Sequence, residues 1–197
     1  IDNIFMGYDA GGGTWADAAS NYNIGIGNYA LDGALNGSLD NIAIGYHAGS
    51  SITSGDSNVF IGNTVGQSVQ TGAGNVAIGH QAFISADYSE GYNTIIGNAA
   101  GRNINNNSAN NNTLIGYNAG RGGTGAMLAC VAIGHSAMDA TDDNGVTGTI
   151  AIGYEALTSL TSGGGNLALG YQAGAGVTTG TYNHFLGHEA GKVHTTG

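Results

Sequence analysis

The stretch that decides the fold is Asn-Ile-Ala-Ile-Gly-Tyr-His-Ala, at residues 41–48. Related copies recur eleven times along the 197 residues, each with apolar residues before a glycine. The motif glycines are 17–20 residues apart, at Gly7, Gly27, Gly45, Gly62, Gly79, Gly97, Gly116, Gly134, Gly153, Gly170 and Gly187. A short, nearly fixed period over a whole chain is typical of stacked-repeat architectures. We therefore predict a single continuous repeat array over residues 1–197, belonging to a longer fibrous protein.

Two positions of the motif, represented by Ile42 and Ile44, hold mostly β-branched side chains. Because they are two residues apart, these side chains point the same way in an extended chain, and β-branched residues favour strands. A period of about 18 residues leaves no room for a packed helix in each turn. The sequence predicts an all-β fold, a parallel β-solenoid (β-roll) of eleven coils, roughly 50 Å long at about 4.8 Å per coil.

The residue between these two positions, Ala43 in the reference copy, has no polar side chain in any repeat. A strand with one face in water should alternate apolar and polar residues, whereas apolar residues on both faces indicate burial on both sides. One face would fill the solenoid, and the other would pack against further copies of the chain. We therefore predict a homo-oligomer, with Ala43 facing a neighbouring chain.

Asparagine opens nine of the eleven motifs, with Cys130 and Thr149 as the exceptions. Stacked asparagines can form a ladder of amide hydrogen bonds, and glycine is needed where the chain turns or another backbone approaches closely. The residues that we single out as the structural motif are Asn41, Ile42, Ile44, Gly45, Ala48, Asn75, Ile78, Gly79, Asn93, Ile96, Gly97, Asn112, Ile115 and Gly116.

A further apolar position recurs seven residues after the motif glycine, at Ala34, Ile52, Val69, Ala86, Ile104, Leu160 and Val177. We interpret it as a second, shorter strand on the opposite wall of each coil. Loops of variable length follow, such as Ser54-Gly55-Asp56-Ser57. Variable loops on a fixed scaffold are where binding diversity usually lies.

Charged residues make up only 8% of the chain, and the net charge is −10. The three basic residues are too few to neutralise a row of phosphates, which argues against nucleic acid and anionic lipid as partners. No apolar run approaches the roughly 18 residues that a membrane span needs. Cys130 is the only cysteine, and we expect it to be a buried apolar residue. This composition is typical of a virion or extracellular protein.

The run from Asn41 to Gly49 resembles the head repeats of trimeric autotransporter adhesins. The copies at 93–97 and 112–116 are similar to repeats of phage and large-virus tail-fibre proteins. This resemblance implies a left-handed roll and a homotrimer about a common axis. The adhesin repeat is shorter, and it usually has serine where this chain has alanine after the glycine. These differences favour the viral fibres.

We therefore expect a structural segment of a trimeric phage or viral tail fibre that mediates host attachment. The alternatives are the head of a bacterial trimeric surface adhesin and, less favoured, a polysaccharide-degrading tailspike. The partner would be a host or cell-surface receptor, with a glycan as one candidate. The family has no catalytic residues in these repeats, and we expect no cofactor.

Glycoside hydrolysis needs two carboxylates a few ångströms apart, and the candidate pairs are Asp87 with Glu90 and Asp142 with Asp143. Solvated turn carboxylates are the favoured interpretation of both.

For metals, His184 and His188 would face the same way in a strand, and residues 142–145 are acidic enough to suggest Ca²⁺. We favour instead that the histidines are polar residues on the wall of the solenoid and that residues 142–145 form an ordinary turn. Loop aromatics that could stack on sugars, or cover the ends of the core, are Trp15, Tyr88, Tyr92 and Tyr182.

Overall fold

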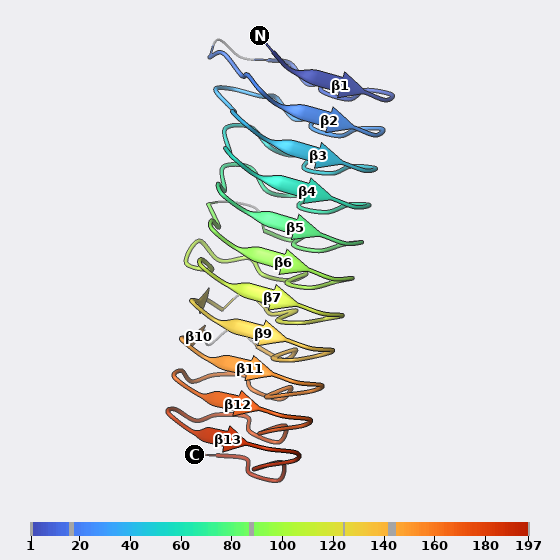
Figure 1. Ribbon diagram of the computed structural model, residues 1–197. Coiled ribbons are helices and arrows are strands. Elements are labelled where there is room, and N and C mark those ends of the chain that lie inside the picture. The colour runs from blue at the N-terminus through green and yellow to red at the C-terminus, as the bar shows by residue number, and fades with distance from the viewer. Residues whose placement is uncertain (1, 16–17, 87–88, 124, 142–144, 197) are drawn as a thin grey trace.

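The computed structural model describes residues 2–15, 18–86, 89–123, 125–141 and 145–196. Within these ranges the chain is all β-strands and turns, without a helix. It is a parallel β-solenoid in which every motif forms one strand of a single long sheet (Figure 1). The sheet consists of β1 (Ile4–Met6), β2 (Ile24–Ile26), β3 (Ile42–Ile44), β4 (Val59–Ile61), β5 (Val76–Ile78), β6 (Thr94–Ile96), β7 (Thr113–Ile115), β9 (Val131–Ile133), β11 (Ile150–Ile152), β12 (Leu167–Leu169) and β13 (His184–Leu186).

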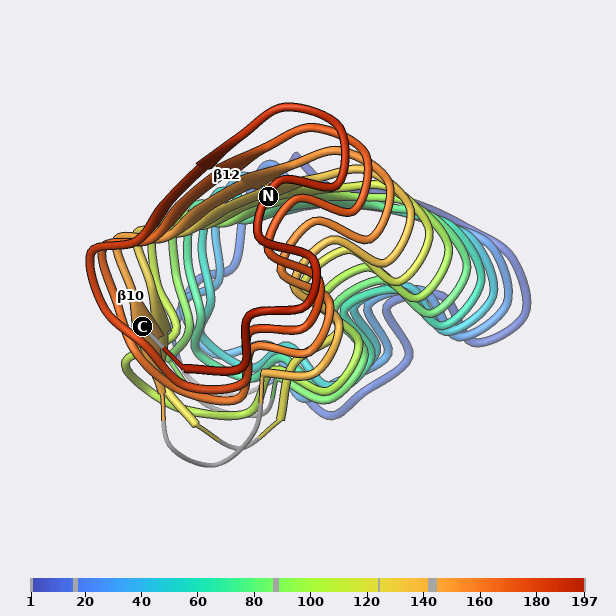
Figure 2. The same ribbon diagram turned by 90° about the horizontal axis from the view of Figure 1, so that it is seen from below.

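Each strand pairs in parallel with the strand of the next coil, and the register matches equivalent motif positions. In the β3–β4 pair, Ile42 lies beside Val59, Ala43 beside Phe60 and Ile44 beside Ile61. This register keeps identical positions in straight columns, because a shift by one residue would exchange the two faces of the sheet. Viewed along the axis, the sheet is one wall of the coil and the turns form the others (Figure 2).

The predicted second strand on the opposite wall is wrong as a general feature. Ile52, Val69 and Ile104 are buried as expected, but they lie in turns or irregular chain. The physical reason is the backbone: the second and fourth residues after each motif glycine have positive φ, 51° at His47 and 57° at Gly49. Such residues interrupt an extended strand. Coil-to-coil hydrogen bonds continue through these turns, for example from Gly49 N–H to Val65 O at 3.0 Å.

Only one pair of strands is described outside the long sheet. Met127–Leu128 (β8) pairs in parallel with Val146–Thr147 (β10). In the second coil the inward residue is Leu35, eight residues after the glycine, while the predicted Ala34 is exposed.

The interior is filled by one bulky side chain in most coils, supplied from either of two positions. One is the middle residue of the strand, and the other is the fourth residue after the motif glycine. Phe60 is paired in this way with Gly66, and Ala77 with Phe83. A Cβ at Gly66 would lie 2.8 Å from the Phe60 ring. A large residue at one position therefore requires a small one at the other, since interiors are close-packed.

Two coils have small residues at both positions, Ala43 with Gly49 and Ala168 with Gly174. Each lies between coils that supply large side chains from both sides. A Cβ at Gly49 would lie 3.0 Å from Phe60 and 3.3 Å from Leu31. The volume of the core is thus shared between neighbouring coils, and no coil is filled independently.

Candidate interaction surfaces

An asparagine ladder runs along the inside edge of the sheet. The Nδ2 of Asn41 donates to the Oδ1 of Asn23 at 2.9 Å and to the carbonyl oxygen of Gly55 at 2.8 Å. The Oδ1 of Asn41 in turn accepts from the backbone N–H and the Nδ2 of Asn58, both at 3.0 Å. The same pattern links Asn58, Asn75, Asn93 and Asn112. Each side chain is buried with its amide used, so these residues hold coils together and are not available to a ligand.

The ladder is interrupted at Cys130 and Thr149. The Cys130 N–H donates to Asn112 Oδ1 at 2.9 Å, which ends the run that begins at Asn3. The thiol lies 3.5 Å from the carbonyl oxygen of Val146, where an asparagine amide would donate in other coils. Burial raises the pKa of this thiol. The β8–β10 pair lies beside this interruption, and the ladder resumes between Asn166 and Asn183.

The motif glycines form a second column, at the end of each strand. Their φ angles are between +121° and +143°, a region that favours glycine. A Cβ at Gly62 would lie 2.5 Å from the carbonyl oxygen of Gly79 in the next coil. Gly45, Gly79, Gly97 and Gly116 have the same arrangement. These positions are fixed by backbone approach between coils. Ala48, three residues after its glycine, is fully buried in the core.

We expected Ala43 to face a neighbouring chain, and this prediction is wrong, because the structure places Ala43 on the inner face of the sheet. That side chain is 0% exposed in the single chain, because the middle residue of each strand points into the solenoid. The flanking positions point outward: Ile44 is 36% exposed, and Ile42, Ile78, Ile96 and Ile115 are partly exposed. Because the strand residues are apolar on both faces of the sheet, the sequence alone did not show which face points into the solenoid. The apolar face that lacks a partner in a single chain is therefore the isoleucine face.

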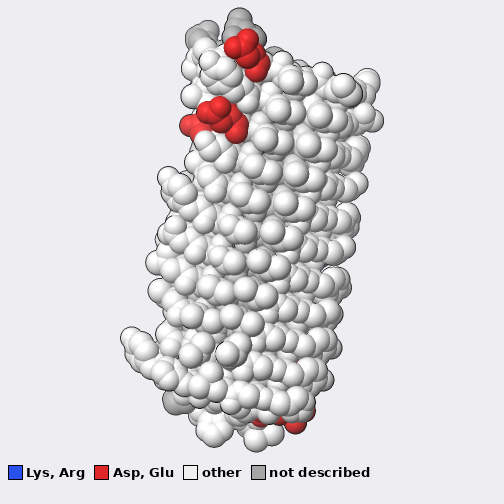
Figure 3. Space-filling view, viewed as in Figure 1, with Lys and Arg blue, Asp and Glu red and all other residues white. Residues whose placement is uncertain are grey.

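We call this surface the outer sheet face: the first and third residues of the eleven strands of the long sheet. Of its 22 positions 19 are apolar, and the exceptions are Thr94, Thr113 and His184. Figure 3 views the molecule from this side and shows no Lys or Arg, with Asp and Glu only towards the two ends. Contiguous exposed apolar surface of this kind marks an interaction site in most soluble proteins.

A row of aromatic rings follows the strand ends, one residue after the motif glycines. Tyr117, His135, Tyr154, Tyr171 and His188 stack in order, with ring centroids 4.9–5.3 Å apart and interplanar angles of 9–25°. Each inner ring has both faces covered by its neighbours, so the row presents ring edges to solvent. It is a stacked ladder along the solenoid, and sequence inspection missed it although the alternation of Tyr and His at this position was visible.

His184 and His188 do not lie together in one strand, contrary to the arrangement that we expected. His184 is in β13, whereas His188 follows Gly187 in a turn and stacks on Tyr171. The positive φ of Gly187, 121°, separates the two segments. The described part of the chain contains no group of three or more His, Cys, Asp or Glu that could hold a metal ion.

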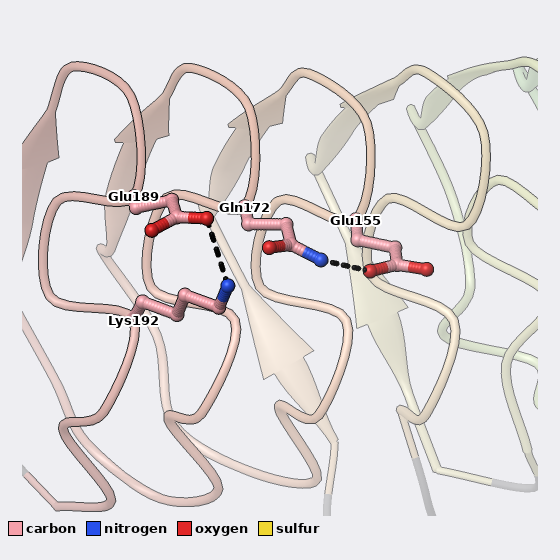
Figure 4. A network of polar contacts seen from close by, with 4 residues as sticks. All are labelled: Glu155, Gln172, Glu189 and Lys192. Carbon is pink, nitrogen blue, oxygen red and sulfur yellow. Dashed lines mark hydrogen bonds and ion pairs between the residues drawn. The ribbon is translucent and has the colours of Figure 1, made fainter.

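Three of the described carboxylates, Asp56, Glu155 and Glu189, each have an individual partner. Asp56 Oδ1 accepts from Leu39 N–H at 2.7 Å, as a turn carboxylate does. Glu155 accepts from Gln172 Nε2 at 2.6 Å, and Glu189 pairs with Lys192 at 2.8 Å (Figure 4). The hydrogen bond from Lys192 lowers the pKa of Glu189, and the hydrogen bond with Glu155 raises that of Tyr154.

Glu90 is buried, unlike a solvated turn carboxylate. Its proposed catalytic partner Asp87 and the pair Asp142 and Asp143 lie outside the described residues, as does most of the acidic turn considered for Ca²⁺. Tyr88 does as well.

The three described loop aromatics differ in setting. Trp15 packs edge-on against Phe5, with centroids 5.6 Å apart, and donates from Nε1 to the Gly11 carbonyl, so it covers the core of the first coil. Tyr92 and Tyr182 are 70% and 81% exposed and lie over glycines of the preceding loops. Of the two interpretations made from the sequence, core cover fits Trp15, while Tyr92 and Tyr182 present their rings to solvent.

Comparison with known protein families, curated protein sequences and solved structures finds no match to this chain. No helix in the described ranges is long and apolar enough to cross a membrane. The assignment of function therefore rests on the surfaces above.

Proposed function

We propose that this chain is a structural segment of a homotrimeric phage or viral tail fibre that mediates host attachment. The observation that carries the proposal is the outer sheet face. It offers 22 positions in two straight columns, which is comparable to the 20–30 residues per partner of a standard protein interface. A long, straight and almost uncharged stripe suits a partner of the same length, and another copy of this chain has that shape.

In this proposal three solenoids, each a left-handed roll, pack their outer sheet faces around a common axis. The resemblance of residues 41–49 to adhesin head repeats supports both the handedness and the number three. The assembly is a stiff rod, because every coil is hydrogen-bonded to the next through the sheet, the turns and the asparagine ladder. Its role is to hold a binding surface away from the particle.

The purified segment tests the assembly directly. We expect a native mass by light scattering of three times the 19.5 kDa chain, together with a β-rich circular dichroism spectrum. A folded monomer at all concentrations would contradict the proposal. The attachment role is tested by adding the trimer to host cells before the virus, where it should compete for adsorption.

The alternative assignment, to the head of a bacterial trimeric adhesin, is supported by the same outer sheet face. The two differ in the flanking regions of the full-length protein. A membrane-anchor domain would identify the adhesin, and a virion-attachment or chaperone domain would identify the fibre.

A further inference from the structure

A hollow of about 400 Å³ lies between three successive loops on the side of the solenoid. Its lining comprises Thr71, Ala73, Ser89, Gly91, Tyr92, Asn107, Asn110 and Asn111. The first two belong to the loop between β4 and β5, the next three to that between β5 and β6, and the asparagines to that between β6 and β7. The volume falls in the lower part of the range of small-molecule sites.

Tyr92 supplies the aromatic surface of the hollow. Its N–H donates to the Ala73 carbonyl oxygen at 2.9 Å, and its φ of 59° turns the side chain across the preceding loop. The ring lies over Gly74, where a Cβ would be only 2.9 Å from it. The ring is therefore positioned by backbone contacts in two coils, yet 70% of the residue stays exposed.

The opposite side is formed by an asparagine-rich loop at residues 103–112. Asn110 anchors it: Oδ1 accepts from Gly91 N–H at 2.6 Å, and Nδ2 donates to the Asn107 carbonyl oxygen at 3.1 Å. The Asn111 N–H also donates to the Gly91 carbonyl oxygen, at 3.2 Å. These bonds tie the loop to the coil that carries Tyr92, so the hollow exists before any ligand binds, which lowers the entropic cost of binding.

The chemistry of the lining selects a neutral, polar ligand. None of the eight lining residues is charged, and the chain as a whole has a net charge of −10 with three basic residues. An anionic ligand would meet an unfavourable field with no counter-charge. An apolar ligand would bury the amide and hydroxyl groups of the lining without hydrogen bonds, which is costly.

We propose that this hollow binds a neutral saccharide unit. The C–H face of a sugar ring would pack on Tyr92, and its hydroxyls would exchange hydrogen bonds with the amides of Asn107 and Asn111 and with the hydroxyl of Ser89. The site deepens the proposed attachment role, on which its biological meaning rests, by naming the receptor class as an uncharged glycan. The stacked ladder from Tyr117 to His188 cannot serve in this way, since its inner ring faces are covered.

The test is saturation-transfer NMR on the purified segment with glucose, galactose, mannose, N-acetylglucosamine and N-acetylgalactosamine as probes, and glucuronic acid as the charged comparison. We expect saturable binding of at least one neutral sugar and weaker or no binding of glucuronic acid. Tyr92→Ala should weaken that binding about tenfold or more, since it removes the stacking surface. Tyr182→Ala is the matched control, because Tyr182 is also largely exposed, lies over Gly165 in the same way and is outside the lining.

Failure of all five neutral sugars, or binding that Tyr92→Ala leaves unchanged while the variant keeps the wild-type thermal transition, would overturn the site. Preferential binding of glucuronic acid would overturn the charge argument. These outcomes are independent of the fibre proposal. A monomeric mass with intact sugar binding would refute the trimer and support the saccharide site. A trimeric mass without sugar binding would support the trimer and refute the saccharide site.

Discussion

The orientation of the strand residues can be tested with two neighbouring substitutions, Ala43→Asp and Ile44→Asp. Both introduce the same charge into β3, one residue apart. Ala43 is 0% exposed and lies beside Phe60 in the sheet. An unpaired carboxylate there should cost about 3–5 kcal/mol. Since domains of this size are stable by about 5–15 kcal/mol, we expect Ala43→Asp to unfold the chain or to lower its melting temperature severely.

Ile44→Asp should leave the fold of a single chain largely intact, because the residue is already 36% exposed. Full burial of an isoleucine stabilises by about 1.5–3 kcal/mol, so covering the remaining third contributes about 0.5–1 kcal/mol per chain. In a trimer the substitution also brings three carboxylates into an apolar interface, where like charges cost several kcal/mol. We expect dissociation into folded monomers.

The assay is light scattering combined with circular dichroism over a range of protein concentrations. Ile44→Ala is the control, since it removes side-chain contacts without adding charge and should weaken assembly less. An Ile44→Asp protein that remains trimeric with an unchanged melting temperature would refute the outer sheet face as an interface. A well-folded Ala43→Asp protein would refute the assignment of the interior.

Three further predictions concern single residues. Gly62→Ala should destabilise the chain by about 1–3 kcal/mol, measured by chemical denaturation, since its φ is +143° and a Cβ would meet a backbone carbonyl. Cys130→Asn should stabilise by about 0.5–1.5 kcal/mol in the same assay, because its amide can donate to Asn112 Oδ1 and extend the ladder; a lower stability would contradict this. Lys192→Met should raise the pKa of Glu189 in an NMR titration. Because this pKa is lowered in the folded chain, the pair contributes stability above the usual glutamate pKa and loses it as the pH falls through the lowered value.

The strands could be predicted because the pattern Asn, apolar, any, Ile, Gly sets their position and their period-2 alternation directly. The orientation of the sheet could not, since both of its faces are apolar. A clue was nonetheless present in residue size. The outward column that contains Ile44 is isoleucine in eight of eleven coils, so its residues do not compensate one another in size. The middle column varies from Gly25 through Ala43 to Phe60, as expected where neighbours restrict it.

The second wall was beyond sequence reasoning for a different reason. Its turns place His47, Gln81 and Glu155 at φ values of 51–56°, which non-glycine residues adopt rarely. Histidine is enriched in the left-handed region, but glutamine and glutamate are not, so residue type alone does not predict these turns. The stack imposes it, because coil-to-coil hydrogen bonds such as His47 N–H to the Asn28 carbonyl oxygen, at 3.0 Å, offset the local cost. The repeat period places the three loops beside Tyr92 in successive coils, but it does not predict that they enclose a hollow.

The sharing of bulky side chains between neighbouring coils limits how such a rod can change its length. A coil is a step of about 4.8 Å, and duplication or loss of one repeat would lengthen or shorten the rod by that amount. Such a change brings together two coils that were not neighbours before. The fold tolerates it only if the side chains of these two coils fill the shared interior between them. The small coil of Ala43 and Gly49, copied beside itself, would be deprived of either Leu31 or Phe60. We expect natural or engineered length variants to gain or lose whole coils. The coils that meet at each new junction should carry large and small side chains that complement each other.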